Sequence, residues 1–315
     1  MTSTGATMAR KRRGQPVHGW IVLDKPEGMT STSAVAAVKR RLDAAKAGHG
    51  GTLDPFATGI LPIALGEATK TVSWAMDGIK QYRFTARWGV ATDTEDREGT
   101  VTGTSGIRPD RAAIEAVLAR FTGEIEQVPP AYSAIKFDGR RAYDLARAGE
   151  APEMKPRMVV VEELRLLETP DEDHAVLEAV CGKGTYIRAL ARDIALALGT
   201  VGHLVALRRT RVGPFDEKCA ISLDELGENM HVAAACEHLL PVETALDDIP
   251  ALAVTDNEAG RLRNGQAVSL LRKADLGRIA ELEGGDTALA KVDGKPVALV
   301  RCAAGEARPV RVLNL

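Results

Sequence analysis

Residues Gly48–Pro55 present one carboxylate, that of Asp54, in a tightly constrained loop. Glycines at positions 48, 50 and 51 let the backbone approach a ligand closely, and Pro55 fixes the chain direction directly after the acid. A carboxylate held in this way can act as a nucleophile or as a general base. An acid between glycines and a proline is also a common turn-former or helix cap, so the motif by itself leaves both interpretations open.

The segments on either side of this loop have the patterns of regular elements that could position it. Residues 17–23 are predicted to form a short buried strand. Ser31 or Thr32 can cap the helix that follows, which has a basic outer face. Residues 60–65 continue from the loop as an apolar segment.

The rest of the chain alternates between strand and helix patterns. We predict strands at 82–90, 159–167 and 175–181, and helices at 109–121 and 185–198. Beyond residue 250, short Val- and Leu-rich segments separated by glycines predict a small β-rich module. With 315 residues, two domains are expected.

Charge is unevenly distributed along a nearly neutral chain. The 41 basic and 43 acidic residues give a net charge of -2. Nine Lys and Arg against three acids nevertheless fall in residues 1–46, and six against one in 183–213. Basic segments of this kind are typical of a polyanion partner, although solvated helix faces and a basic tail explain them equally well.

Residues 123–157 interrupt the regular pattern. They contain Pro129-Pro130 and a run of basic residues, including Arg140 and Arg141, interleaved with Tyr132, Phe137 and Tyr143. This mixture suits an exposed excursion that grips RNA. The alternative is a long surface connection with ordinary solvating charges.

Cysteine and histidine spacing indicates no metal site. The four cysteines include no Cys-x-x-Cys pair, and the six histidines lack the close spacing of metal ligands. We therefore expect reduced thiols, no metal and no cofactor. The sequence has neither an apolar run long enough to span a membrane nor a signal-peptide core at its start, so a cytoplasmic protein without a membrane partner is expected.

Five ordered motifs resemble those of one enzyme family, the bacterial tRNA pseudouridine-55 synthases. Residues Gly48–Pro62 closely resemble the catalytic motif of that family. The four other matching segments are Gly19–Ser31, Lys80–Thr94, Gln127–Tyr143, and Gly184–Arg188 with Leu207–Arg209. The resemblance covers about residues 17–213, and five motifs in the same order make it highly specific.

The resemblance implies a fold and a domain arrangement. The expected fold is α+β, with a mixed, mainly antiparallel sheet flanked by helices and a small C-terminal β-rich RNA-binding domain similar to PUA domains. The expected domains are a disordered basic tail at 1–16, a catalytic domain at 17–249 with an RNA-gripping insertion at 123–157, and the PUA-like domain at 250–315.

The resemblance also implies an activity, the isomerisation of uridine 55 in the T-loop of tRNA. Asp54 matches the catalytic aspartate, which either attacks the nucleotide or takes a sugar proton. The sequence leaves both routes open. Arg188 matches the arginine that pairs with this carboxylate. Tyr82 matches the tyrosine beside the uracil, where it could stack and shuttle a proton.

Substrate contacts follow from the same resemblance. The target base must leave the folded loop before it can react, and His49 matches a histidine that occupies the vacated space. Tyr186 and Leu207 match pocket residues at the flipped base, although Leu207 also suits a simple core position. Lys25 matches a basic residue near the RNA backbone, and Arg140 and Arg141 belong to the insertion. The implied partner is the T-arm of tRNA.

Three other interpretations compete with this one. A nucleoside hydrolase could use Asp54, but it would need an activated water, and no second nearby acid or metal cluster is evident in the sequence. A non-catalytic RNA-binding or tRNA-folding protein would use the same basic faces. A guide-RNA-dependent relative is the third, but the insertion favours a stand-alone enzyme without guide RNA, which we expect to be a monomer.

Overall fold

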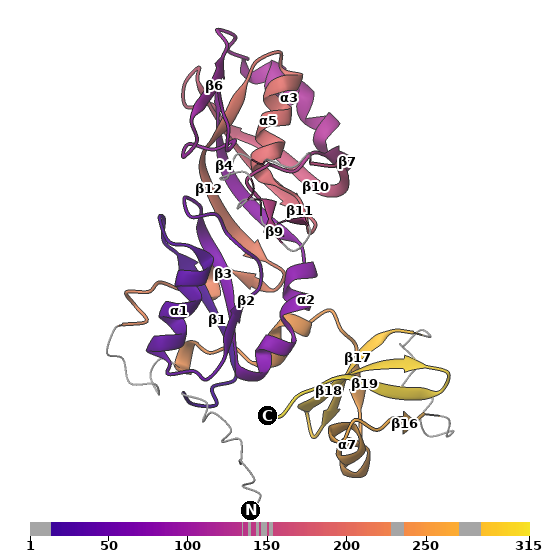
Figure 1. The fold of residues 1–315 in the computed structure, drawn as a ribbon. Helices are drawn as coiled ribbons and strands as arrows, with labels where there is room; N and C mark the ends of the chain where they lie inside the picture. Colours follow the sequence, from indigo (N-terminus) through magenta and orange to yellow (C-terminus); the bar gives the residue numbers. More distant parts are fainter. Residues whose placement is uncertain are drawn as a thin grey trace, which may run out of the picture.

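The computed structural model describes residues 14–133, 135–137, 140–142, 145, 150, 154–227, 236–270 and 285–315 (Figure 1). The predicted basic tail at 1–16 therefore lies outside the described residues except for its last three. The predicted insertion is described only in parts.

One large sheet forms the body of the molecule. Within the described residues it has ten strands in the order β14-β1-β3-β12-β4-β11-β10-β7, with β13 paired to β12 and β2 paired to β3. The β1–β14 and β3–β12 pairs are parallel and the others are antiparallel. The strands are β1 (Gly19–Lys25), β2 (Ala47–His49), β3 (Thr58–Leu65), β4 (Lys80–Trp88), β7 (Gly123–Gln127), β10 (Arg157–Glu168), β11 (His174–Cys181), β12 (Gly202–Val212), β13 (Phe215–Asp216) and β14 (Ala220–Ile221). This sheet confirms the mixed, mainly antiparallel arrangement that was predicted.

Helices cover the sheet, and the alternation of β1 explains why both of its faces are buried. Ile21 and Leu23 point into the core shared with α1, α3 and α5, whereas Trp20 and Val22 point into a second core on the opposite face. The helices are α1 (Ser31–Arg41), α2 (Val72–Asp77), α3 (Arg111–Leu118), α5 (Ile187–Ala197) and α7 (Asp256–Arg263). Short 3₁₀ turns are η1 (Gly66–Lys70), η2 (Ala119–Phe121), η3 (Glu217–Cys219), η4 (Cys236–His238) and η5 (Val242–Leu246).

The cap of α1 differs from the prediction by one residue. Thr30 is the cap, because its hydroxyl accepts a hydrogen bond from the Ser33 backbone N–H at 3.0 Å. Ser31 instead lies inside the helix and is buried. Its hydroxyl accepts from the backbone N–H of Leu53 at 2.8 Å and donates to the carbonyl of Leu53 at 2.9 Å. The residue predicted to cap the helix therefore fastens the helix to the loop that carries the candidate carboxylate.

The predicted insertion at about 123–157 begins and ends at strands of the main sheet. Its first residues form β7, and its last residue begins β10, which pairs with β7 in the main sheet through Gln127 and Arg157. The excursion thus leaves and re-enters the sheet at neighbouring positions. Within it, β8 (Lys136–Phe137) pairs with β9 (Arg140–Arg141) as a short hairpin. A second small hairpin, β5 (Val90–Thr92) and β6 (Val101–Thr104), follows β4.

The C-terminal segment forms a second, smaller sheet, as the glycine-punctuated pattern predicted. In the described residues its order is β15-β17-β18-β19-β16 (Figure 1). Helix α7 packs on it, and a core that includes Leu252, Leu262 and Val300 lies between them. The strands are β15 (Ala251–Ala253), β16 (Val268–Ser269), β17 (Thr287–Val292), β18 (Lys295–Ala303) and β19 (Glu306–Val312).

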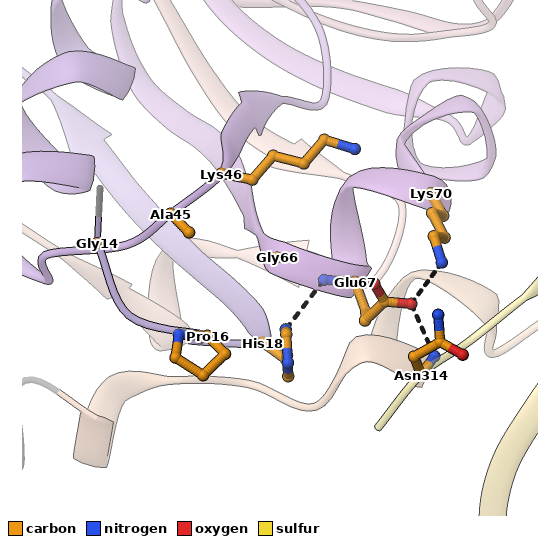
Figure 2. A pocket seen from close by; sticks show the side chains of 9 residues that line it. All are labelled: Gly14, Pro16, His18, Ala45, Lys46, Gly66, Glu67, Lys70 and Asn314. Atoms are coloured by element: carbon orange, nitrogen blue, oxygen red, sulfur yellow. Dashed lines mark hydrogen bonds and ion pairs between the residues drawn. The ribbon is translucent and has the colours of Figure 1, made fainter. Parts of the chain in front are cut away.

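The two sheets share an apolar cluster and a polar junction. Leu289, Leu299 and Leu313 belong to the same core cluster as Trp20. Beside it lies a cavity of about 530 Å³ that the end of the chain helps to line (Figure 2). Its central group is Glu67, whose Oε2 accepts hydrogen bonds from Lys70 Nζ at 2.6 Å and from the Asn314 backbone N–H at 2.7 Å. The C-terminal sheet is therefore attached to the body both by strand residues and by the residues that follow its last strand.

Candidate active site

Asp54 and Arg188 form an ion pair between the loop that leads into β3 and the start of α5. Arg188 Nε lies 2.9 Å from Asp54 Oδ2, and Arg188 Nη2 lies 3.3 Å from Asp54 Oδ1. The arginine side chain is 7% exposed and the aspartate side chain is 32% exposed. A buried, two-pronged guanidinium therefore holds a carboxylate that is only partly exposed.

Further bonds fix the direction of the Arg188 guanidinium. Its Nη1 donates to the carbonyl of Thr94 at 3.0 Å, and its Nη2 donates to the carbonyl of Tyr132 at 2.9 Å. The buried carboxylate of Asp96 lies 3.5 Å from Nη1. The guanidinium is thus bonded on each of its three nitrogens, so its position does not depend on Asp54 alone.

Opposing influences act on the ionisation of Asp54. Burial raises the pKa of the Asp54 carboxyl, and the positive charge of Arg188 opposes that rise. The nearby charge of Asp96 adds to the rise in pKa. Arg188 therefore favours the ionised form that nucleophilic or general-base chemistry requires.

Tyr82 lies in the middle of the sheet on β4. Its cross-strand neighbour on β12 is Arg209. Burial raises the pKa of the Tyr82 hydroxyl, and the charge of Arg209 and a hydrogen bond to it act in the opposite direction. The ring packs against the main core, so strand pairing fixes the phenol beside a buried cation.

Lys25 anchors the Asp54 loop in this structure. Its side chain is fully buried at the end of β1. Its Nζ donates to the carbonyls of Pro26 at 2.9 Å, Met29 at 2.7 Å and Pro55 at 3.1 Å. Burial lowers the pKa of this ammonium to about 8. Because an ammonium has three N–H groups, the predicted contact with an RNA backbone would require it to release one of these carbonyls.

Arg209 also holds the loop, and sequence reasoning did not select it as a site residue. Its guanidinium is buried and donates to the carbonyls of Ile60 at 2.8 Å, Gly51 at 3.1 Å and Thr52 at 3.3 Å. The only available signal was its place in the Leu207–Arg209 motif. Every residue has a main-chain carbonyl, so the positions that accept these hydrogen bonds cannot be recognised from their residue types.

Gly59 lets β3 approach β12 closely enough for these bonds. It has a φ of +97°, and a Cβ built there would lie 2.2 Å from the carbonyl oxygen of Arg209. We expect Gly59→Ala to lower the free energy of unfolding by at least about 2 kcal/mol, since both the left-handed backbone and the contact disfavour a side chain. Thermal or urea denaturation measures this. Gly103→Ala is the matched control, because a Cβ at Gly103 meets nothing within 4 Å, and an equal loss in both variants would contradict the explanation.

The other predicted pocket residues lie on three separate elements. His49 ends β2, opposite Ile63 of β3. Tyr186 precedes α5, where the Gln127 side chain accepts from its backbone N–H at 2.8 Å and donates to its carbonyl at 3.1 Å. Burial raises the pKa of the Tyr186 hydroxyl. Leu207 is 7% exposed and belongs to the main core, which agrees with its alternative interpretation as a packing residue.

The two arginines of the excursion lie on β9. Arg140 is exposed, and its Nη1 lies 3.0 Å from Glu150 Oε2. The backbone of Arg141 pairs with Lys136, and its side chain lies outside the described part of the structure. Among the described residues Arg140 forms no ion pair with Asp54 and its bond goes to Glu150 instead.

The described residues contain neither a candidate metal centre nor a helix that could span a membrane. No group of three or more His, Cys, Asp or Glu side chains within them could hold a metal ion. No helix among them is both long and apolar enough to cross a membrane.

Two family models match adjacent parts of the chain. Residues 39–187 match the TruB family pseudouridylate synthase N-terminal domain, and residues 188–247 match the tRNA pseudouridylate synthase B C-terminal domain. The Asp54 loop, Tyr82 and the excursion lie within the first match, and Arg188 begins the second.

Curated relatives are similar over nearly the whole chain. The tRNA pseudouridine synthase B of Rhodospirillum rubrum is 58% identical over 308 residues, which are 98% of this chain and 100% of the relative. The tRNA pseudouridine synthase B of Caulobacter vibrioides is 55% identical over 309 residues, again 98% of this chain and 100% of the relative.

Solved structures share the fold. A chain from a Cbf5-Nop10-Gar1 complex matches with a TM-score of 0.69 and 28% identity, over 94% of this chain and 83% of its own. A chain from an H/ACA RNP bound to a substrate RNA containing 2′-deoxyuridine matches with a TM-score of 0.71 and 24% identity, over 98% of this chain and 92% of its own. Taken with the two family models and the curated relatives, these matches place the chain in the TruB family of pseudouridylate synthases.

Proposed function

We propose that this protein is a tRNA pseudouridine synthase that isomerises uridine 55 in the T-loop of tRNA. Family membership supports the reaction, since curated relatives that are 55% and 58% identical to this chain are tRNA pseudouridine synthase B enzymes. The observation that carries the proposal is the Asp54–Arg188 pair, a partly exposed carboxylate aimed by a buried guanidinium.

The reaction needs a carboxylate but no change in oxidation state. The bond between uracil N1 and ribose C1′ breaks, and uracil C5 is joined to C1′, while C5 loses a proton and N1 gains one. Asp54 either attacks the nucleotide or removes a sugar proton, and both routes require it to be ionised. In either route the charge of Arg188 opposes the rise in the Asp54 pKa that burial causes, and so favours the ionised form.

Tyr82 is proposed to act at the uracil ring. A phenol beside the flipped base can stack on it and can take part in moving the C5 proton. The position of Tyr82 on a central strand supports this role, because strand pairing on both sides of β4 restrains the ring.

Binding is proposed to require extrusion of the base from the T-loop. A base inside a folded loop cannot present its glycosidic bond to Asp54 until it has left the stack. In this scheme His49 fills the vacated space, and Tyr186 and Leu207 contact the flipped uracil. Lys25 acts mainly by holding Pro55, the residue after the catalytic aspartate.

The excursion is proposed to bind RNA phosphates through Arg140 and Arg141. Replacing both arginines by Ala should weaken tRNA binding and lower the slope of log affinity against log salt by about 1.5, since each phosphate contact contributes roughly 0.7–0.9. Filter binding at several salt concentrations measures the slope. Arg111 and Arg120, exposed residues outside the excursion, provide the matched double-Ala control. An unchanged slope for the Arg140 and Arg141 variant would mean that these arginines are solvated surface residues that do not contact RNA phosphates.

The central experiment supplies purified protein with an unmodified tRNA transcript and no other macromolecule. We expect release of tritium from C5-labelled uridine, with one carbon-linked isomer found at position 55 by sequencing. Absence of turnover without an added RNA would contradict the stand-alone assignment and favour guidance by a second RNA. Free uracil as the product would indicate a hydrolase.

We also propose that the protein is a monomer and that it acts in the cytoplasm, where its tRNA substrate is found.

A further inference from the structure

Arg209 is a buried cation at the centre of the protein. It lies on β12 and is 2% exposed. Among the described residues no carboxylate forms a salt bridge with it, and its guanidinium donates to three main-chain carbonyls in addition to its hydrogen bond with the Tyr82 hydroxyl. Burying a charge without an ion pair is costly unless hydrogen bonds compensate it, so the position of these carbonyls is informative.

The three carbonyls lie on both sides of Asp54 in the sequence. Gly51 and Thr52 precede the aspartate, and Ile60 follows it at the start of β3. A single planar guanidinium therefore spans the base of the loop. The backbone of Arg209 makes a further contact with the loop, because Gly59 packs against its carbonyl oxygen.

The same side chain faces the strand that carries Tyr82. Arg209 and Tyr82 are directly opposite each other in the antiparallel pairing of β12 with β4, and residues paired in this way have side chains on the same face of a sheet. The guanidinium also influences the ionisation of the Tyr82 hydroxyl. Arg209 is thus in contact with both elements that hold the proposed catalytic groups.

We propose that Arg209 is a positioning residue that fixes the Asp54 loop against the Tyr82 strand and so sets the relative placement of these two side chains. Only one part of the inference, the expected loss in the rate of isomerisation, rests on the proposed function. Arg209 does not need to touch the RNA. A misplacement of about 1 Å in a catalytic group can cost roughly a hundredfold in rate, which sets the scale of the expected effect.

Arg208 provides a control at the next position of the same strand. Its guanidinium makes a two-pronged ion pair with Asp24 at 3.0 and 2.8 Å and bonds Glu217 at 2.7 Å. Its side chain is 36% exposed. Arg208→Lys and Arg209→Lys make the same chemical change on a half-exposed side chain and on a buried one.

The first measurement is hydrogen–deuterium exchange of the free protein. Lysine retains the charge but not the planar fork, so Arg209→Lys should raise exchange in the peptide covering residues 51–60 by at least about tenfold, while peptides from the C-terminal sheet stay as in the wild type. Arg208→Lys should leave the loop peptide unchanged. Normal loop protection in Arg209→Lys would overturn the proposal.

The second measurement separates rate from binding. In a single-turnover assay Arg209→Lys should lower the rate by about a hundredfold, while the tRNA Kd changes less than about threefold. A loss confined to Kd, or a wild-type rate, would overturn the proposal. Because the exchange measurement uses no RNA, it still tests positioning if the wild-type protein fails to isomerise uridine 55.

Gly51→Ala tests the contact between the loop and Arg209 by a change in the loop. It also provides a test if the Arg209→Lys variant does not fold. Gly51 has a φ of +117°, a backbone conformation that alanine disfavours, so Gly51→Ala should shift the backbone and displace the accepting carbonyl. We expect Gly51→Ala to raise the exchange of the loop peptide as Arg209→Lys does. In the double variant that combines Gly51→Ala with Arg209→Lys, the fold loss in rate should be smaller than the product of the two single losses. Unaltered exchange in Gly51→Ala, or multiplicative losses in the double variant, would contradict the coupling.

Discussion

Replacing Asp54 by Asn is expected to abolish isomerisation while leaving tRNA affinity within about tenfold of the wild type. Asn preserves the shape of the side chain but cannot attack as an anion or accept a proton as a base. Binding should survive because it is distributed over many phosphate contacts. Arg188 would keep its bonds to the carbonyls of Thr94 and Tyr132, so the pocket should remain assembled.

Single-turnover release of C5 tritium, with enzyme in excess over tRNA, measures the chemical step directly. Asp77→Asn serves as a control for the charge change, since Asp77 is exposed at the end of α2 and pairs with Lys183. Turnover by Asp54→Asn near the wild-type rate would remove Asp54 from the reaction. If Asp77→Asn also lost activity, the loss in Asp54→Asn would be explained by the change in net charge and not by the position of the Asp54 carboxylate.

Arg188→Lys and Arg188→Ala are both expected to lower the chemical step by at least about a hundredfold while tRNA still binds. The guanidinium bonds both oxygens of Asp54 and two backbone carbonyls at once. A lysine ammonium is a point charge and cannot reproduce this planar fork. The expected loss is of the size seen when a positioned electrostatic partner is removed.

Arg188→Ala should also change the pH dependence of the reaction. Burial raises the pKa of Asp54 and Arg188 opposes the rise, so removal of the guanidinium should raise that pKa further. The reaction needs the ionised carboxylate, and the acid limb of the residual single-turnover rate should therefore move to higher pH.

Arg192→Lys is the matched control for both Arg188 variants, because Arg192 lies one turn later on α5 and pairs with Glu95 and Asp193 instead. A lysine variant at position 188 that turns over normally would place Arg188 outside the active site. An acid limb that stays fixed in Arg188→Ala would mean that the arginine aims Asp54 without affecting its ionisation.

The sequence predicted the local features of the site better than its supports. Glycines and a proline around Asp54 mark a constrained loop through their own backbone preferences, and these preferences are visible without a structure. The supports of that loop are Lys25, Ser31 and Arg209, which bond to main-chain atoms. Main-chain acceptors are present at every position, so no spacing of residue types reveals them.

The ends of predicted segments were harder to place than the segments themselves, because they depend on contacts with distant parts of the chain. The predicted insertion absorbed β7, whose burial is irregular because it is an edge strand, with only Gln127 buried. The glycine-punctuated pattern predicts a second β-rich module, but it does not predict how that module contacts the body. Leu289 and Leu299 have the pattern of strand residues in their own sheet, and only the fold shows that they also pack with Trp20.

The long separation between the Asp54 loop and Arg209 has a consequence for the synthesis of the protein. Gly51 and Arg209 are 158 residues apart in the chain, so at roughly 5–20 residues per second the loop waits about 8–30 s for its support to emerge from the ribosome. During that interval the start of β3, Thr58 and Gly59, lacks the β12 partner that it has in the finished fold, whereas residues 63–65 can already pair with β2. Pro62 lies within β3 and has no N–H to offer a neighbouring strand. The nascent strand is thereby a poorer template for aggregation while it waits for its partner.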